Sequence, residues 1–142
     1  MTGQVKVFAQ ACIDPRFRFP IETFIQKKFQ VKPTEYDLKT DAGGIREIAL
    51  KTAVGDWLIT NARIAHDKHG VRTFVLCNHM DCAYYGGSGS FPGVEEERLA
   101  YELDLKSAAG ILGQQFPDVR IYVYLVSKEE KPKERFIFQQ VV

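Results

Sequence analysis

Short runs of hydrophobic residues alternate with amphipathic segments along this chain. The runs are rich in β-branched and aromatic residues and end at polar turns, which is typical of buried strands. The segments between them carry hydrophobic residues at three- and four-residue spacing, which predicts helices that bury one face. The predicted strands are 5–12, 35–40, 71–77, 119–127 and 135–142, and the predicted helices are 20–31, 53–68 and 94–116.

The alternation of strands and helices predicts an α/β fold with a mainly parallel β-sheet flanked by helices. The last predicted strand follows a charged turn at 128–134 and is expected at an edge of the sheet. No internal repeat, linker or low-complexity segment divides the sequence, so we expect a single domain over residues 1–142. Ligand sites of parallel sheets form beyond the carboxyl ends of the strands. The residues that follow the first and third predicted strands are therefore the first candidates for a site.

Composition and charge exclude several classes of partner. The chain is 45% hydrophobic, and its 19 basic and 18 acidic residues give a formal net charge of +1. Without a basic excess, we expect no nucleic-acid partner. No apolar run approaches the roughly 20 residues of a membrane span, and the N-terminus lacks the pattern of an export signal. We therefore expect a cytoplasmic protein with no membrane partner.

The chain contains three cysteines, Cys12, Cys77 and Cys82. In a reducing compartment, metal binding or catalysis is more typical of cysteines than a disulfide framework. A Cys77–Cys82 disulfide stays open as an alternative. Cys77 lies within a hydrophobic run, so we expect it to pack as a structural residue.

Cys12 ends the first predicted strand, whereas His79 and Cys82 follow the third. If these two strands are neighbours, the three side chains converge at one end of the sheet. Two thiolates and an imidazole suit zinc, and three protein ligands leave the fourth position open, as in catalytic sites. Taken alone, His-x-x-Cys is a weak signal. A histidine after a strand is more often structural, and a lone cysteine is usually a small buried apolar group.

Two further residues make a zinc site a stronger interpretation of this pattern. Asp14 and Arg16 follow Cys12, so that residues 12–16 read Cys-x-Asp-x-Arg, and residues 79–82 read His-x-x-Cys. Together and in this order, the two motifs resemble those of the β-class carbonic anhydrases. The order and spacing of the predicted elements are also similar to that family, so the resemblance extends over most of the chain.

A third stretch adds to the resemblance. DAGGI at 41–45 resembles an Asn-Ala-Gly stretch of the family. The sequence also departs from the family pattern, with Pro15 in place of serine, Thr40 in place of arginine, Asp41 in place of asparagine and Ala83 in place of glycine.

The resemblance implies reversible hydration of carbon dioxide to bicarbonate by a zinc-bound hydroxide. Zinc is then held by Cys12, His79 and Cys82. Asp14 either accepts a hydrogen bond from the hydroxide or takes the fourth position on the metal itself. Arg16 decides between these states, because a bidentate ion pair holds Asp14 away from the metal. The alternative for this pair is a surface ion pair of little energetic value.

The resemblance also implies a homodimer or a higher homo-oligomer, because the family's sites lie at a subunit interface. The apolar last strand supports this expectation. Only eleven residues precede Cys12, so we expect an interface without the N-terminal helical arm of many members. Two other functions stay open. One is a zinc-dependent hydrolase of carbonyl sulfide or carbon disulfide, and the other is a non-catalytic zinc-binding relative.

Several further residues are candidates with an ordinary structural alternative. Gly43 and Gly44 either let the backbone approach a bound ligand or form a plain tight turn. Asp81 is either a turn residue or a hydrogen-bond acceptor for a ligand. Two histidines at the end of a predicted helix are solvated caps or a proton shuttle, and four aromatic residues line a pocket for carbon dioxide or pack in the core. These are His66, His69, Phe17, Phe19, Tyr84 and Tyr85.

Overall fold

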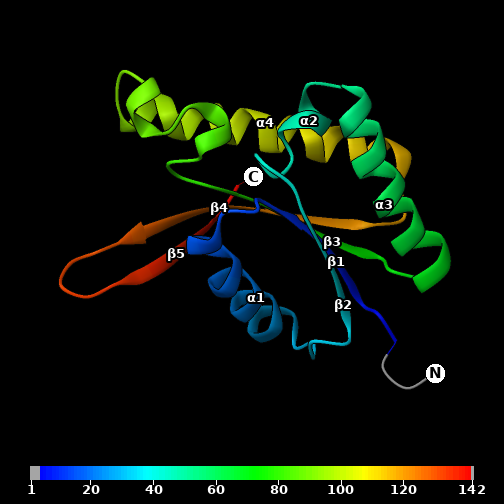
Figure 1. Cartoon of the computed structure of the whole chain (residues 1–142). Helices are drawn as coiled ribbons and strands as arrows, with labels where there is room; N and C mark the ends of the chain where they lie inside the picture. Colours follow the sequence, from blue (N-terminus) through cyan, green and yellow to red (C-terminus); the bar gives the residue numbers. More distant parts are fainter. Residues whose placement is uncertain (1–3, 142) are drawn as a thin grey trace.

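A five-stranded β-sheet forms the middle layer of the protein, whose computed structural model describes residues 4–141 (Figure 1). The strand order is β2-β1-β3-β4-β5. The first four strands are parallel, and β5 at the edge is antiparallel to β4. The mainly parallel α/β fold and the C-terminal edge strand are thus confirmed. The strands are β1 (Val7–Ala11), β2 (Tyr36–Thr40), β3 (Thr73–His79), β4 (Arg120–Glu129) and β5 (Arg135–Gln140).

Helices cover both faces of the sheet (Figure 1). One face packs on α1 (Pro15–Phe29), through a cluster that includes Ile21 and Ile25. The other face packs on α2 (Arg46–Ala49), α3 (Ala53–His69) and α4 (Val94–Gln115). A sheet buried on both faces needs hydrophobic residues on both sides of each strand. This is why its strands are near-continuous hydrophobic runs in the sequence.

Helix α1 begins at Pro15 and not at the predicted residue 20. The Asp14 side chain accepts a hydrogen bond from the backbone N–H of Arg16 and so caps the helix, while proline suits the first helical position. Pro20 lies inside the helix, where its missing N–H removes one backbone hydrogen bond without ending the helix. The start of α1 therefore carries Asp14 and Arg16, directly after β1.

Strand β3 begins and ends two residues later than predicted, so His79 is its last residue rather than a residue beyond it. The backbone of His79 pairs with Val126 of β4, which fixes the direction of the imidazole. Helix α3 matches the prediction, and Gly70 ends it with φ +72°. The short helix α2 and two 3₁₀ turns at Ala83–Tyr85 and Ser88–Ser90 were not predicted, because they are too short to show a helical period.

Strands β1 and β3 are direct neighbours, with Val7 opposite Thr73 and Gln10 opposite Leu76. The chain leaves β1 toward β2 on one side and returns to β3 on the other. The carboxyl ends of β1 and β3 thus flank a point where the strand order reverses, which is the usual place of a ligand site in such sheets. Over residues 4–141, none of the helices combines the length and the hydrophobicity that a membrane crossing requires.

Candidate metal centre

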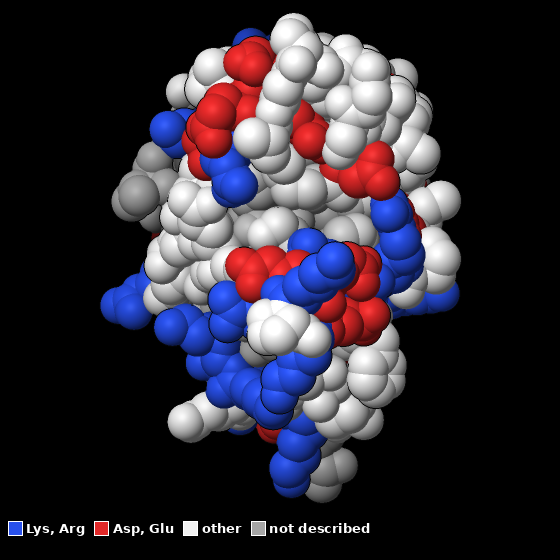
Figure 2. All heavy atoms as spheres, turned by 90° about the vertical axis from the view of Figure 1, so that its left-hand side faces the viewer, with Lys and Arg blue, Asp and Glu red and all other residues white. Residues whose placement is uncertain are grey.

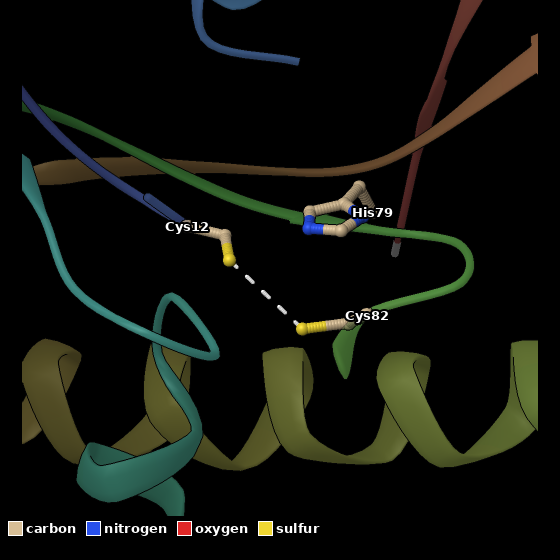
Figure 3. A group of neighbouring side chains, drawn as sticks. All are labelled: Cys12, His79 and Cys82. Atoms are coloured by element: carbon tan, nitrogen blue, oxygen red, sulfur yellow. Dashed lines mark hydrogen bonds between the residues drawn. The ribbon is translucent and has the colours of Figure 1, made fainter. Parts of the chain in front are cut away.

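The three predicted ligands come together at the carboxyl ends of β1 and β3 (Figure 3). Cys12 directly follows β1, His79 ends β3, and Cys82 lies in the turn after it. One ligand atom from each of the three residues lies within 4.8 Å of the other two, and all three side chains are buried. The Sγ atoms of Cys12 and Cys82 are 3.9 Å apart. The expected convergence of the two motifs is therefore present.

The geometry of these three residues fits zinc. A tetrahedral ion about 2.3 Å from each sulfur sets two sulfurs about 3.8 Å apart, close to the distance seen here. Nδ1 of His79 lies 2.8 Å from the backbone oxygen of Met80, which can only accept, so Nδ1 carries the proton. Nε2 then has a free lone pair, and it is buried without a hydrogen-bond partner. A buried, unpartnered ring nitrogen beside two thiols is what a zinc ligand requires.

The charges of the two thiols also favour a cation. A hydrogen bond between the two side chains lowers the pKa of the Cys12 thiol, although burial opposes this shift. The same hydrogen bond, together with burial, raises the pKa of the Cys82 thiol. One negative charge therefore forms readily between the sulfurs, and a second one requires a compensating positive charge. A divalent metal ion supplies that charge.

Cys77 lies on the opposite face of the sheet, in the cluster that packs against α1. Burial raises the pKa of its thiol to about 12, so it stays protonated and unreactive. All three cysteines are free, and the alternative of a Cys77–Cys82 disulfide is wrong. The predicted packing role of Cys77 is confirmed.

Asp14 and Arg16 form a bidentate ion pair at the rim of the ligand cluster. Nε of Arg16 lies 3.1 and 3.2 Å from the two carboxylate oxygens of Asp14, and Nη2 lies 2.7 Å from Oδ2. Hydrogen bonds from Arg16 lower the pKa of the Asp14 carboxyl, which is thus ionised near neutral pH. Oδ2 of Asp14 also lies 3.7 Å from Nε2 of His79. The carboxylate therefore stands beside the candidate metal position, whereas its arginine partner is half exposed.

A cavity of about 440 Å³ opens over Cys12 and Asp14. Figure 2 views the side on which β1 and β3 end, where uncharged side chains form a hollow between mainly acidic groups above and a mixture of acidic and basic groups below. Most of the cavity wall is apolar, which suits an uncharged substrate. The lining residues are Cys12, Ile13, Asp14, Pro15, Ala42, Gly43, Ala83 and Tyr84.

Of the four aromatic candidates, only Tyr84 lies among the residues that line this cavity. Phe17 instead stacks on the ring of His79, with centroids 4.3 Å apart. Phe19 is 78% exposed on the outer side of α1. Tyr85 donates a hydrogen bond to Asp104 at 2.6 Å and packs on the α4 side. The pocket role predicted for Phe17, Phe19 and Tyr85 is therefore not supported by their positions.

The histidines at the end of α3 pair with carboxylates. His66 contacts Asp67 at 2.7 Å and Asp118 at 2.9 Å, and His69 contacts Asp37 at 2.7 Å. Neither ring lines the cavity over Cys12. Both rings are thus held by contacts to carboxylates and are not solvated caps.

The loop that faces the site requires glycine at two positions. Gly43 and Gly44 have φ values of +79° and +62°, in the left-handed region that favours glycine. A Cβ on Gly43 would collide with the ring of Tyr84. A Cβ on Gly44 would lie 2.5 Å from the Asn78 side chain and 2.9 Å from the backbone oxygen of Cys77. The two glycines thus serve both a tight turn and a close approach to β3.

Replacing Gly44 tests this packing. Gly44→Ala is expected to lower the free energy of unfolding by about 2 kcal/mol, because it adds both backbone strain and a steric clash. The control is Gly110→Ala in α4, where an added Cβ meets nothing within 4 Å and should stabilise the helix by about 0.5–1 kcal/mol. Urea unfolding of the two variants measures the difference. Equal stability of both variants would contradict the close packing of the loop on β3.

The sequence analysis missed two buried residues of α4, Glu97 and Tyr101, that support the turn carrying Cys82. Glu97 is buried, and its Oε2 accepts hydrogen bonds from the backbone N–H of Asp81 at 2.7 Å and from the Tyr101 hydroxyl at 2.8 Å. The Tyr101 hydroxyl in turn accepts from the backbone N–H of Cys82 at 3.2 Å. The signal was present, because Glu97 falls in phase with the buried positions of α4, namely Tyr101, Leu105, Ala108 and Leu112.

Solved structures of carbonic anhydrases share this fold. A carbonic anhydrase of Streptococcus mutans superposes with a TM-score of 0.63 at 15% identity, covering 99% of this chain and 83% of that chain. The β-carbonic anhydrase CafD of Aspergillus fumigatus gives a TM-score of 0.62 at 15% identity, covering 100% and 91%. A structure from a study of two tetrameric β-carbonic anhydrases of Sordaria macrospora gives a TM-score of 0.52 at 12% identity. The match covers 88% of this chain and 76% of that chain.

Sequence comparison identifies the family. No curated protein matches this chain. A family model described as "Putative carbonic anhydrase" matches residues 2–135, which is nearly the whole chain. With the fold and the ligand cluster described above, this match shows that the chain belongs to the β-carbonic anhydrase family as a divergent member.

Proposed function

We propose that this protein is a zinc-dependent carbonic anhydrase that converts carbon dioxide reversibly to bicarbonate. The observation that carries the proposal is the position of Asp14. Its carboxylate lies beside the buried Cys12, His79 and Cys82 cluster and is bound by Arg16. A purely structural zinc site needs neither an adjacent carboxylate nor a cavity above it. Membership of the family supports the same activity.

The three ligands each have a defined task. Zinc bound there supplies a Lewis acid that makes hydroxide available from water near neutral to mildly alkaline pH. Cys12 and Cys82 offer thiolates that offset most of the charge of the ion. The backbone oxygen of Met80 keeps His79 in the tautomer whose Nε2 faces the sulfurs. Phe17, stacked on the ring, further restricts its orientation.

Asp14 acts on the attacking oxygen atom. Its ionised carboxylate accepts a hydrogen bond and so directs a lone pair of that oxygen toward the substrate carbon. Arg16 holds the carboxylate by two parallel hydrogen bonds and keeps it from serving as a ligand itself. The pair therefore keeps the fourth position accessible.

The cavity indicates a small, uncharged substrate. Ile13, Ala42 and Ala83 form apolar wall beside Cys12 and Asp14. Carbon dioxide can enter such a cavity without losing strong interactions with water. Carbonyl sulfide and carbon disulfide have a similar linear shape, so assays with all three substrates are required.

The proposal is tested by metal analysis and a hydration assay. The purified protein is expected to contain about one zinc ion per chain, and stopped-flow assays should show carbon dioxide hydration that increases from neutral to alkaline pH. Hydrolysis of the sulfur analogues without hydration of carbon dioxide would replace the proposed substrate. Bound zinc with no activity on any of the three substrates would reject the catalytic function.

A further inference from the structure

Arg16 binds two carboxylates that come from different motifs. On one side it holds Asp14, as described above. On the other side its Nη1 donates to Oδ2 of Asp81 at 3.1 Å, and its Nη2 donates to the backbone oxygen of Asp81 at 2.9 Å. Asp81 directly precedes the ligand Cys82. The guanidinium therefore links the start of α1 to the turn that carries a metal ligand.

Asp81 is itself fixed by its surroundings. It has a φ of +60°, and its backbone N–H donates to the buried carboxylate of Glu97 at 2.7 Å. Its Oδ1 accepts a hydrogen bond from the backbone N–H of Ser88 at 2.8 Å. The Ser88 hydroxyl also donates to Glu97 at 2.9 Å. Asp81 is thus tied to α4 and offers Arg16 an anchor that does not depend on Asp14.

A single partner could not fix the Arg16 guanidinium. The Arg16 side chain is 45% exposed, and a long side chain in solvent that is bound only to Asp14 can move together with it. Bonds to Asp81 on the opposite side fix the guanidinium relative to Cys82. This matters because Oδ2 of Asp14 is already 3.7 Å from Nε2 of His79, so a small displacement would bring it to the metal position.

We propose that Asp81 is a positioning residue that orients Arg16 and thereby keeps Asp14 from becoming a metal ligand. The proposal deepens the proposed function and rests on it. Asp81 acts only through Arg16 and touches neither the substrate nor the metal position. Without its carboxylate, Arg16 loses one anchor, and Asp14 gains access to the fourth position.

Cobalt(II)-substituted protein provides a direct test, with thiocyanate as the probe. Thiocyanate binds cobalt only when the fourth position is open, and the visible spectrum of cobalt reports its binding. Asp81→Asn is expected to weaken thiocyanate binding about tenfold. The double variant Asp81→Asn/Asp14→Asn should restore the affinity of Asp14→Asn alone, which general damage to the site could not do. The matched control is Glu130→Gln, whose carboxylate pairs with Lys128 near the same surface and should leave the affinity unchanged.

A second readout does not require the metal. In nuclear magnetic resonance spectra, the Nε–H of Arg16 should exchange with solvent about tenfold faster in Asp81→Asn than in the wild type, because the guanidinium is less restrained. Unchanged exchange, or unchanged thiocyanate affinity, would overturn the role of Asp81. A wild type that binds cobalt and thiocyanate but hydrates no carbon dioxide would instead reject the proposed function and leave this role standing. If the protein takes up no cobalt, the exchange rate of Arg16 alone decides.

Discussion

Arg16→Ala is expected to retain zinc but to lose about 99% of its carbon dioxide hydration activity at neutral pH, since a site open 1% of the time is about 100-fold less active. The substitution removes the hydrogen bonds that lower the Asp14 pKa. The carboxylate nevertheless stays ionised near neutral pH, because its ordinary pKa is about 4. An unrestrained anion next to the metal position can then become the fourth ligand.

The pH dependence of this variant identifies the cause of its inactivity. Hydroxide competes with a carboxylate for zinc better than water does, so activity should recover in part as the pH rises. Lys28→Ala, which removes an exposed cation in the last turn of the same helix, is the control and should keep full activity. Zinc content and stopped-flow rates at several pH values measure both effects. Full activity of Arg16→Ala at neutral pH would mean that the ion pair has no part in the mechanism.

Cys82→Ser is expected to abolish stoichiometric zinc binding, whereas Cys77→Ser should leave it unchanged. Loss of a residue that merely supports a ligand costs 10- to 100-fold in metal affinity, so loss of a thiolate ligand should cost more than about 100-fold. Cys77 lies on the α1 side of the sheet, where a buried hydroxyl should reduce stability by about 1–3 kcal/mol without affecting the metal.

X-ray absorption at the zinc edge provides the measurement for this pair of variants. The wild type should show sulfur neighbours at about 2.3 Å and nitrogen at about 2.1 Å. Only oxygen and nitrogen neighbours in the wild type would rule out the proposed ligand set. Loss of zinc from Cys77→Ser would assign the metal to a different set of ligands.

Much of the fold and of the site follows from local sequence patterns. The runs that form β1 and β3 are buried on both faces, and this double burial makes parallel strands easy to recognise in a sequence. The motifs around Cys12 and His79 follow these strands, so the adjacency of the strands is sufficient to bring the ligands together. The strands and the ligand cluster could therefore both be predicted from short stretches of sequence.

The sequence analysis was wrong about the start of α1, where two prolines give the same helix-start signal. It also missed a buried residue whose hydrogen-bond partner is distant in sequence. Pro20 was taken as the first residue of a helix, yet Asp14 and Pro15 give the same start signal five positions earlier, and the helix continues through the second proline. The buried role of Glu97 was not predicted, because its partner, the backbone of Asp81, is 16 residues away in sequence. Contacts of this kind depend on how the 3₁₀ turns after β3 fold, which no short-range pattern determines.

The cap of α1 gives the site a property that its ligands alone would not have. Oδ1 of Asp14 accepts a hydrogen bond from the backbone N–H of Arg16 at 2.9 Å, while Oδ2 of the same carboxylate faces His79. Movement of Asp14 onto the metal therefore competes with the cap of α1, whose loss costs about 1 kcal/mol. Binding of Asp14 to the metal, which closes the site, is thus coupled to fraying of the first turn of α1. Substitutions in that turn that never approach the metal should consequently change how often the site is open.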